Sequence, residues 1–309
     1  MRRYLYFAVF VSGMTSLALE MAASRLLGNY FSSSNLVWAS VIGLILIYLA
    51  VGYYVGGRWA DRSPHFATLF KILAWAGFSG GILPLVARPV LRLADAAFNQ
   101  LQLGALLGSF VSVLVLFIVP MILMGTASPF AIRLAVRDRE SAGEVAGRIY
   151  AVSTLGSFLG TFLPVLVLVP LVGIFRTFVI IGGMLLVVAL IGLGRASGGR
   201  AVLKLAWMPL ILLALAIIGT RGFDKATPGL IYETESGYNY IQVVEENGYH
   251  LLRLNEGQGV HSIYHPDVLN YQGPWEQVLV APFFNPAPYP LAAVERMAII
   301  GLAAGTTAR

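Results

Sequence analysis

Residues 36–57 read LVWASVIGLILIYLAVGYYVGG, a run without a single charged side chain. A helix rises about 1.5 Å per residue, so a run of this length can cross a hydrocarbon core of about 30 Å. The whole chain has the same character, because 58% of its 309 residues are hydrophobic and only 12% are charged. An average soluble domain has about a quarter of its residues charged. The composition therefore predicts a membrane protein.

Six further apolar runs of similar length accompany this one. They cover residues 4–28, 67–87, 105–124, 149–170, 171–194 and 203–220. Pro170 predicts a tight turn between the fifth and sixth spans, and Pro209 makes the last run the weakest of the seven. A signal peptide at the N-terminus is disfavoured, because Glu20 interrupts its apolar region and more spans follow. We therefore expect a multi-pass α-helical bundle of about seven spans.

The basic residues predict how this bundle is oriented. With a cytoplasmic N-terminus, twelve Lys and Arg residues between the spans fall on the cytoplasmic side and only three, Arg88, Arg92 and Arg176, fall outside. This bias predicts a multi-pass protein with its N-terminus in the cytoplasm. Seven crossings would place residues 221–309 outside the cytoplasm, and six would return them to it.

Charge and cysteine content restrict the classes of function. Residues 1–229 hold 18 basic and 7 acidic residues, whereas residues 230–309 hold 3 and 8. The arginines follow the ends of apolar helices and not one soluble face, which argues against nucleic-acid binding. Because the chain has no cysteine, thiolate nucleophiles and cysteine metal sites are excluded. His261 and His265 have a spacing that suits a metal, but the neighbouring glycines and Pro266 disfavour the helix it needs.

The composition changes after Arg221, where a soluble region begins. Residues 231–235 and 238–245 are rich in β-forming residues, and Tyr240, Gln242 and Val244 would share one face. Glu246-Asn247-Gly248 predicts a hairpin turn, and residues 249–254 would form the returning strand. Residues 257–290 are rich in Gly, Pro and aromatic residues and predict loops with short helices.

The last thirteen residues, 297–309, have the pattern of a nucleotide-binding turn. Residues 297–300 form a short apolar run, typical of a buried parallel strand. Gly301 and Gly305 then bracket a small-residue turn, and Thr306 could cap a following helix. Backbone N–H groups at such a helix start can face an anionic or polar ligand. An ordinary strand-to-loop connection is the alternative reading of these residues.

Three patterns within the apolar runs admit a functional reading and a structural one. Glu20 and Arg25 are either a transport or coupling site or buried polar anchors, each meeting another helix. Residues 56–62, predicted as a loop after the second span, look like the Gly-x-x-x-Asp-Arg loop of major-facilitator transporters, or are simply a charged cytoplasmic loop. Gly156 and Gly160 are four residues apart and favour close helix packing over a direct function.

Motifs along the chain resemble those of bacterial fused transporter-like/spermidine synthase proteins. The membrane half of that family has Ser-Gly…Glu…Arg-Leu-Leu in its first span and Tyr-x-x-Asn-Thr-Leu-Gly-x-x-x-Gly further on. The chain has similar residues at 12–27 and 150–160. The spermidine synthase (polyamine aminopropyltransferase) part resembles residues 236–243, 252–258, 264–266 and 301–305.

The resemblance implies three domains. They are a transmembrane domain over residues 1–220, a β-rich domain over 221–290, and over 291–309 the first strand and glycine turn of an incomplete Rossmann-like, methyltransferase-type domain. The implied reaction moves an aminopropyl group from decarboxylated S-adenosylmethionine, as cosubstrate, to an amine such as putrescine. Neither a metal nor a resident cofactor is implied. The amine site would be bordered by Tyr238, Asn239, Gln258, Tyr264 and His265, and the nucleoside by Gly301, Ala304, Gly305 and Thr306.

Departures from the family pattern leave the activity open. Asn239 replaces a glutamine, Pro266 a glutamate and Ala303 a glycine. The family's ribose-binding acid and its general base follow the glycine turn, so we assign no catalytic residue and expect a truncated chain that is inactive alone. A second chain or a homodimer would complete the enzyme. The alternatives are a polyamine transporter and a membrane scaffold with a vestigial enzyme domain.

Overall fold

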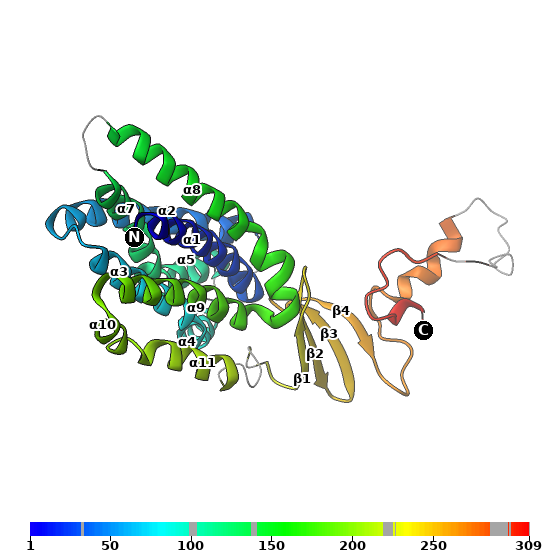
Figure 1. Cartoon of the computed structure of the whole chain (residues 1–309). Helices are drawn as coiled ribbons and strands as arrows, with labels where there is room; N and C mark the ends of the chain where they lie inside the picture. The colour runs from blue at the N-terminus through cyan, green and yellow to red at the C-terminus, as the bar shows by residue number, and fades with distance from the viewer. Residues whose placement is uncertain are drawn as a thin grey trace. The chain divides into compact units, whose positions relative to one another are not determined.

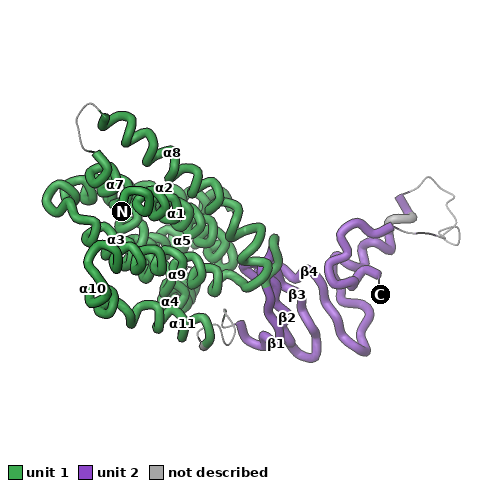
Figure 2. The backbone as a smooth tube through the Cα atoms, in the orientation of Figure 1, with its two compact units in different colours: residues 1–225, 235–238 green, residues 226–234, 239–309 purple. Residues whose placement is uncertain are grey.

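The computed structural model describes residues 1–31, 34–98, 104–136, 141–218, 225, 227–284, 296 and 298–308. The chain forms two compact units, shown in different colours in Figure 2. The helical unit comprises Met1–Lys225 together with Glu235–Tyr238, and the β unit comprises Ala226–Thr234 and Asn239–Arg309.

The helical unit begins with α1 and α2, the two long N-terminal helices seen in blue in Figure 1. The helices that the structure describes are α1 (Arg2–Phe31), α2 (Asn35–Arg62), α3 (Phe66–Gly81), α4 (Leu83–Phe98), α5 (Gly104–Leu116), α6 (Ile118–Gly125), α7 (Ala127–Ala135), α8 (Ala142–Leu163), α9 (Val169–Ser197), α10 (Gly199–Leu203) and α11 (Trp207–Ile218).

Four helical segments of the described chain are long and apolar enough to cross a membrane. They are α1, α2, the α6–α7 segment and the α8–α9 segment, and the pair α3–α4, bent by 47°, would make a fifth. Helices α5 and α11 have only 13 and 12 residues, short of the roughly 20 that a span needs. The predicted membrane-type helical architecture is therefore supported, but the number of seven spans is not confirmed.

The α8–α9 segment covers 56 consecutive residues. As one straight helix it would be about 84 Å long, well over twice the thickness of a hydrocarbon core. It contains a π-helical turn at Pro164–Leu168 and a break at Gly173, whose φ of 78° lies in the left-handed region. Figure 1 shows the chain turning back between α8 and α9. The turn predicted at Pro170 thus comes three residues later, at Gly173.

Close packing of α8 on α1 depends on small side chains. A Cβ at Gly156 would collide with the carbonyl oxygen of Phe10, and one at Gly160 would collide with that of Met14. Between these glycines, the Ser157 hydroxyl donates to the Gly13 carbonyl over 3.1 Å. The predicted small-residue packing is therefore confirmed.

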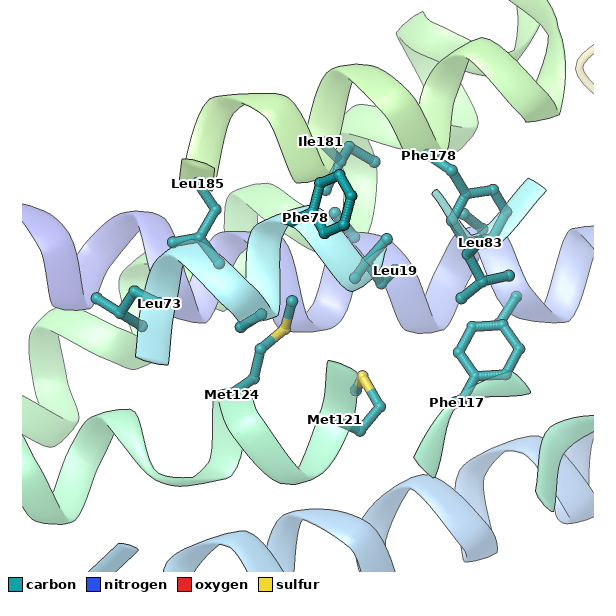
Figure 3. Packing of buried hydrophobic residues seen from close by; sticks show 14 of the residues in the cluster. Leu19, Leu73, Phe78, Leu83, Phe117, Met121, Met124, Phe178, Ile181 and Leu185 are labelled. Carbon is teal, nitrogen blue, oxygen red and sulfur yellow. The ribbon is translucent and has the colours of Figure 1, made fainter. Parts of the chain in front are cut away.

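The core of the helical unit is formed by side chains from several helices. Figure 3 shows Leu19 of α1 near Phe78 of α3, with Met124 of α6 below them and Ile181 of α9 above. Leu19 and Ile181 are fully buried, and Phe117 and Phe178 are in ring contact at 6.3 Å between centroids. Van der Waals contacts of this kind favour the packing of membrane helices, because lipid tails are as apolar as the side chains and give no hydrophobic driving force.

Residues 56–62 are helical, so the prediction of a loop there is wrong. Helix α2 continues to Arg62, and Gly56 lies against Thr126 so closely that a Cβ would come within 2.6 Å of its Cα. Asp61 pairs with Arg133 at 3.1 Å on the exposed surface. The helix therefore extends beyond its apolar run and ends just before Ser63-Pro64, because the residue before a proline is disfavoured in a helix.

The β unit contains a four-stranded sheet in the order β1-β2-β3-β4. The strands are β1 (Leu230–Glu235), β2 (Tyr240–Glu246), β3 (Tyr249–Leu254) and β4 (Val260–Tyr264). Asn247 and Gly248 both have positive φ, 52° and 84°, and join antiparallel β2 and β3. This confirms the predicted hairpin, and alternate residues Tyr240, Gln242 and Val244 are buried as expected.

Two predictions in the C-terminal region are wrong. Residues 260–264 were expected to be loop but form β4, which pairs antiparallel with β3. Residues 298–300 were expected to be a buried strand but have no strand structure, and Ile300 is 99% exposed. No strand of the described sheet pairs with them, and a buried strand needs such neighbours. Met297 lies outside the described residues, and the Rossmann-like domain is not confirmed.

Candidate functional site

A cavity of about 500 Å³ lies in the β unit where the β2–β3 hairpin turns. Most of its lining side chains are polar or aromatic: Glu246, Asn247, Tyr249, Leu251, Ile263, Asn270, Tyr271 and Gln272. We call it the hairpin cavity. Its volume lies in the usual range for small-molecule sites, about 300–1,000 Å³.

Aromatic contacts hold one side of the hairpin cavity in place. The Tyr249 ring packs on the His265 ring with 4.7 Å between centroids, and it meets Tyr271 edge-on at 6.3 Å. The Tyr271 hydroxyl accepts a hydrogen bond of 3.2 Å from the His265 backbone N–H. The two tyrosines are therefore fixed against β4 and form a rigid aromatic wall.

Glu276 shapes the loop that brings Tyr271 to the cavity. Its carboxylate accepts hydrogen bonds from the backbone N–H groups of Tyr271 and Gly273. These bonds favour the charged form and lower the pKa of the Glu276 carboxyl. The loop is thus tied to an ionised carboxylate at neutral pH.

Glu246 gives the hairpin cavity its charge. A carboxylate oxygen lies 3.6 Å from Nη2 of Arg253, and the Glu246 side chain remains largely exposed. A carboxylate beside tyrosine rings suits an ammonium group, because the anion and the π-faces both attract a cation. The arrangement is therefore chemically suited to an amine.

The predicted amine-site residues do not all come together. The strand pairing puts Tyr264 opposite His250, close to the hairpin turn, whereas Gln258 lies beyond the other end of β3 and β4. At about 3.3 Å per residue, the length of β4 separates Gln258 from Tyr264 by more than about 13 Å. His265 contacts the cavity wall, so it and its neighbour Tyr264 are the predicted residues closest to the hairpin cavity in the chain's fold.

Asn239 and Tyr238 have other surroundings. The Asn239 side-chain oxygen accepts a 3.1 Å hydrogen bond from Asn255, at the end of the sheet opposite the hairpin turn. Tyr238 belongs to the helical unit, and its side chain is 86% exposed. The role of all five residues in binding an amine stays a prediction.

The predicted nucleoside turn is fastened to β4. The Ala304 N–H donates to the Ser262 hydroxyl over 2.9 Å, and the Thr306 hydroxyl exchanges 2.8 Å hydrogen bonds with the backbone of Ile263. Gly301 and Gly305 have positive φ, as a glycine turn requires, and the Gly305 N–H donates to the Leu302 carbonyl. Two of its N–H groups are thus used within the protein, and nucleoside binding stays a prediction.

Arg25 and Glu235 form a polar cluster in the helical unit. Arg25 donates to the backbone carbonyl of Ser236 over 2.8 Å and also to that of Tyr238. The Glu235 carboxylate accepts from the Asn29 side chain at 2.9 Å and from the Ile174 N–H. Ile174 directly follows the break at Gly173, so Glu235 caps the helix that restarts there. Arg25 is thus a polar anchor, but the expectation that it meets another helix is wrong, because its partners are the backbone carbonyls of residues 236 and 238.

Comparison with known proteins supports a functional class. The chain is similar to polyamine aminopropyltransferases. It is 28% identical over 173 residues to both polyamine aminopropyltransferase 2 and polyamine aminopropyltransferase 1 of Ralstonia nicotianae. The match covers 56% of this chain and about a third, 32% and 31%, of the two relatives. No family model matches the chain, and no solved structure matches it.

Three residues of the hairpin cavity were not predicted from the sequence as site residues: Glu246, Tyr249 and Tyr271. The first two flank the predicted Asn247-Gly248 turn and face each other across the hairpin, so the turn itself was the signal that could have found them. His261 and His265 are not part of a larger group: within the described residues, no three His, Asp or Glu side chains gather as metal ligands would.

Proposed function

We propose that this chain is a membrane-anchored, spermidine synthase-like protein whose β unit binds an amine. The hairpin cavity carries the proposal, because it combines the Glu246 carboxylate with the Tyr249 and Tyr271 rings. An ammonium group would lie beside the carboxylate and the hydrocarbon chain of the amine would lie along the rings. The similarity to polyamine aminopropyltransferases supports an aliphatic amine such as putrescine as the ligand.

The reaction of that class would join the amine nitrogen to an aminopropyl carbon of decarboxylated S-adenosylmethionine while the carbon–sulfur bond breaks. The displacement needs the two reactants in line and a group to take the amine proton. Glu246, the carboxylate at the hairpin cavity, pairs with Arg253 over 3.6 Å, and we assign it to holding the amine and not to taking its proton. We therefore propose that this chain by itself binds the amine without transferring the aminopropyl group. A second chain or a second copy would supply the base.

The helical unit would hold the protein in a bacterial inner membrane. Its long apolar helices support this, and the excess of basic residues supports a cytoplasmic N-terminus.

Amine binding is tested with the full chain in detergent and radiolabelled putrescine in equilibrium dialysis. We expect Glu246→Gln to weaken binding about tenfold, since charge-assisted hydrogen bonds contribute about 1.5–3 kcal/mol. Glu245→Gln is the matched control, because the neighbouring strand residue points to the other face of the sheet. Equal binding by the wild type and the Glu246 variant would overturn the proposal.

A further inference from the structure

The helical unit has a cavity of its own, with a volume of about 570 Å³. It lies between the end of α2, the first half of α3 and α6, and its lining residues are Trp59, Ser63, Thr68, Lys71, Ile72, Trp75 and Leu123. We call it the α2–α3 cavity. None of these residues takes part in the proposed amine site, so the two cavities can be examined independently.

Polar groups gather at one end of the α2–α3 cavity. The Ser63 hydroxyl, just past the last residue of α2, lies 2.9 Å from the Thr68 hydroxyl in the first turn of α3. Lys71 follows one turn later on the exposed surface. Within the described part of the chain, its ammonium group has no carboxylate partner. This end therefore offers a cation and two hydroxyl groups to an anionic ligand.

The other end of the cavity is apolar. Trp59 lies one helical turn before Ser63, and Trp75 lies one turn after Lys71 on the same face of α3. Trp75 is held edge-on by Phe78 at 6.1 Å and by Trp207 at 5.9 Å, and Trp59 is held by Phe130 at 6.1 Å. Both tryptophans remain partly exposed.

The polar end of the cavity lies at the end of a candidate span and its apolar end lies deeper. A phospholipid has the same order, with its headgroup at the membrane surface and its acyl chains below. Helix α2 is a candidate span that ends at Arg62, so Ser63 lies at the span's end and Trp59 lies inside it. Tryptophan at this depth is typical of the membrane–water interface, and a lysine there extends its ammonium group toward the headgroups. Arg58, Arg62 and Arg133 add positive charge at the same end of α2 and α7, although Arg133 is paired with Asp61.

We propose that the α2–α3 cavity binds a phospholipid with a net negative headgroup, such as phosphatidylglycerol. The lipid phosphate would accept hydrogen bonds from the Lys71 ammonium group and from one hydroxyl of the Ser63–Thr68 pair, since the other hydroxyl donates within the pair. The first part of an acyl chain would pack on Trp75 and Leu123, where a free phosphate would gain nothing. The site would thus recognise both the negative charge and the acyl chain of its ligand.

Lipid retention by the full chain tests the proposal. The protein is purified in a neutral detergent, incubated with equal amounts of phosphatidylglycerol and phosphatidylcholine, and examined by native mass spectrometry. We expect preferential retention of phosphatidylglycerol and about fivefold less of it on Lys71→Gln, because one cation near an anionic headgroup has an effect of this order. Lys71→Arg should retain the lipid. Lys204→Gln, which removes a lysine that does not line the cavity, is the matched control.

Two further arms separate the possible ligands. Leu123→Trp should fill the apolar end and lower phosphatidylglycerol retention without changing the charge. Inorganic phosphate in millimolar excess should not displace the lipid. Displacement by phosphate would identify a soluble anion as the ligand and would overturn the proposal. Equal retention of the two lipids, or unchanged retention by both the Lys71→Gln and Leu123→Trp variants, would also overturn it.

Discussion

Single polar side chains in this protein organise backbone that has no regular partner of its own. Arg25 satisfies two carbonyls in residues 236–238, and Glu276 satisfies two N–H groups in residues 271–273. An unmatched carbonyl or N–H group away from water is costly, so these charged groups fix the path of the segments that they contact. Each carries out locally what a strand or helix would otherwise do.

Replacing Arg25 should loosen the segment at Tyr238. We expect Arg25→Leu to speed cleavage by chymotrypsin after Tyr238 about tenfold, since losing a charged hydrogen bond costs about 1.5 kcal/mol or more and local opening rises accordingly. The products of limited proteolysis are identified by mass spectrometry. Arg148→Leu, which removes an exposed ion pair with Glu144, should leave the cleavage rate unchanged. Equal rates for all three proteins would contradict the anchoring role.

At the scale of elements, packing of α8 on α1 depends on the absence of side chains. We expect Gly156→Ala to destabilise the helical unit by about 1–3 kcal/mol, because the new methyl group would push against the Phe10 backbone. Gly147→Ala in the same helix is the matched control, since nothing lies within 4 Å of its Cβ position. That variant should be neutral or slightly stabilising. Thermal unfolding in detergent measures both, and a lower midpoint for Gly147→Ala than for Gly156→Ala would refute the prediction.

The elements also show which features the sequence could predict. The β2–β3 hairpin was predictable because Asn247-Gly248 has local turn chemistry that hardly depends on the rest of the fold. The extension of α2 to Arg62 was missed because Gly56, Gly57 and the charged residues after them resemble a loop, although Pro64 marks the end of the helix. Strand β4 was missed because glycines and proline around it resemble loop, and only its pairing with β3 makes it a strand.

The residues of the candidate site also differ in how far the sequence could predict them. Glu246 and Tyr249 flank a turn that the sequence identifies, so their neighbourhood was within reach of prediction. Tyr271 lines the same cavity because its backbone N–H donates to the Glu276 carboxylate, which fixes the loop between them. No periodic pattern in the sequence predicts this hydrogen bond. The family resemblance placed Gln258 and Tyr264 in one amine site, but the two residues lie toward opposite ends of β4.

For the molecule as a whole, the excess of apolar over charged residues predicts residence in a membrane. We expect the full chain to remain in the membrane pellet after an alkaline carbonate wash and to require detergent for release. Apolar spans in a bilayer are not released by breaking ionic contacts. Immunoblotting of pellet and supernatant measures the outcome. Release of most of the protein by carbonate would contradict the membrane assignment, whereas release of a peripheral protein in the same sample shows that the wash worked.

The division of the chain into units has a consequence for its evolution. Residues 235–238 belong to the helical unit, although the segments on both sides of them belong to the β unit. A recombination event with one breakpoint anywhere between residues 226 and 238 would therefore separate part of one unit from the rest of that unit. The recombined chain would lack the carbonyls to which Arg25 donates, or the Glu235 carboxylate that accepts from the first N–H group after Gly173. Lineages that carry this arrangement should inherit both halves together and not shuffle them as interchangeable modules.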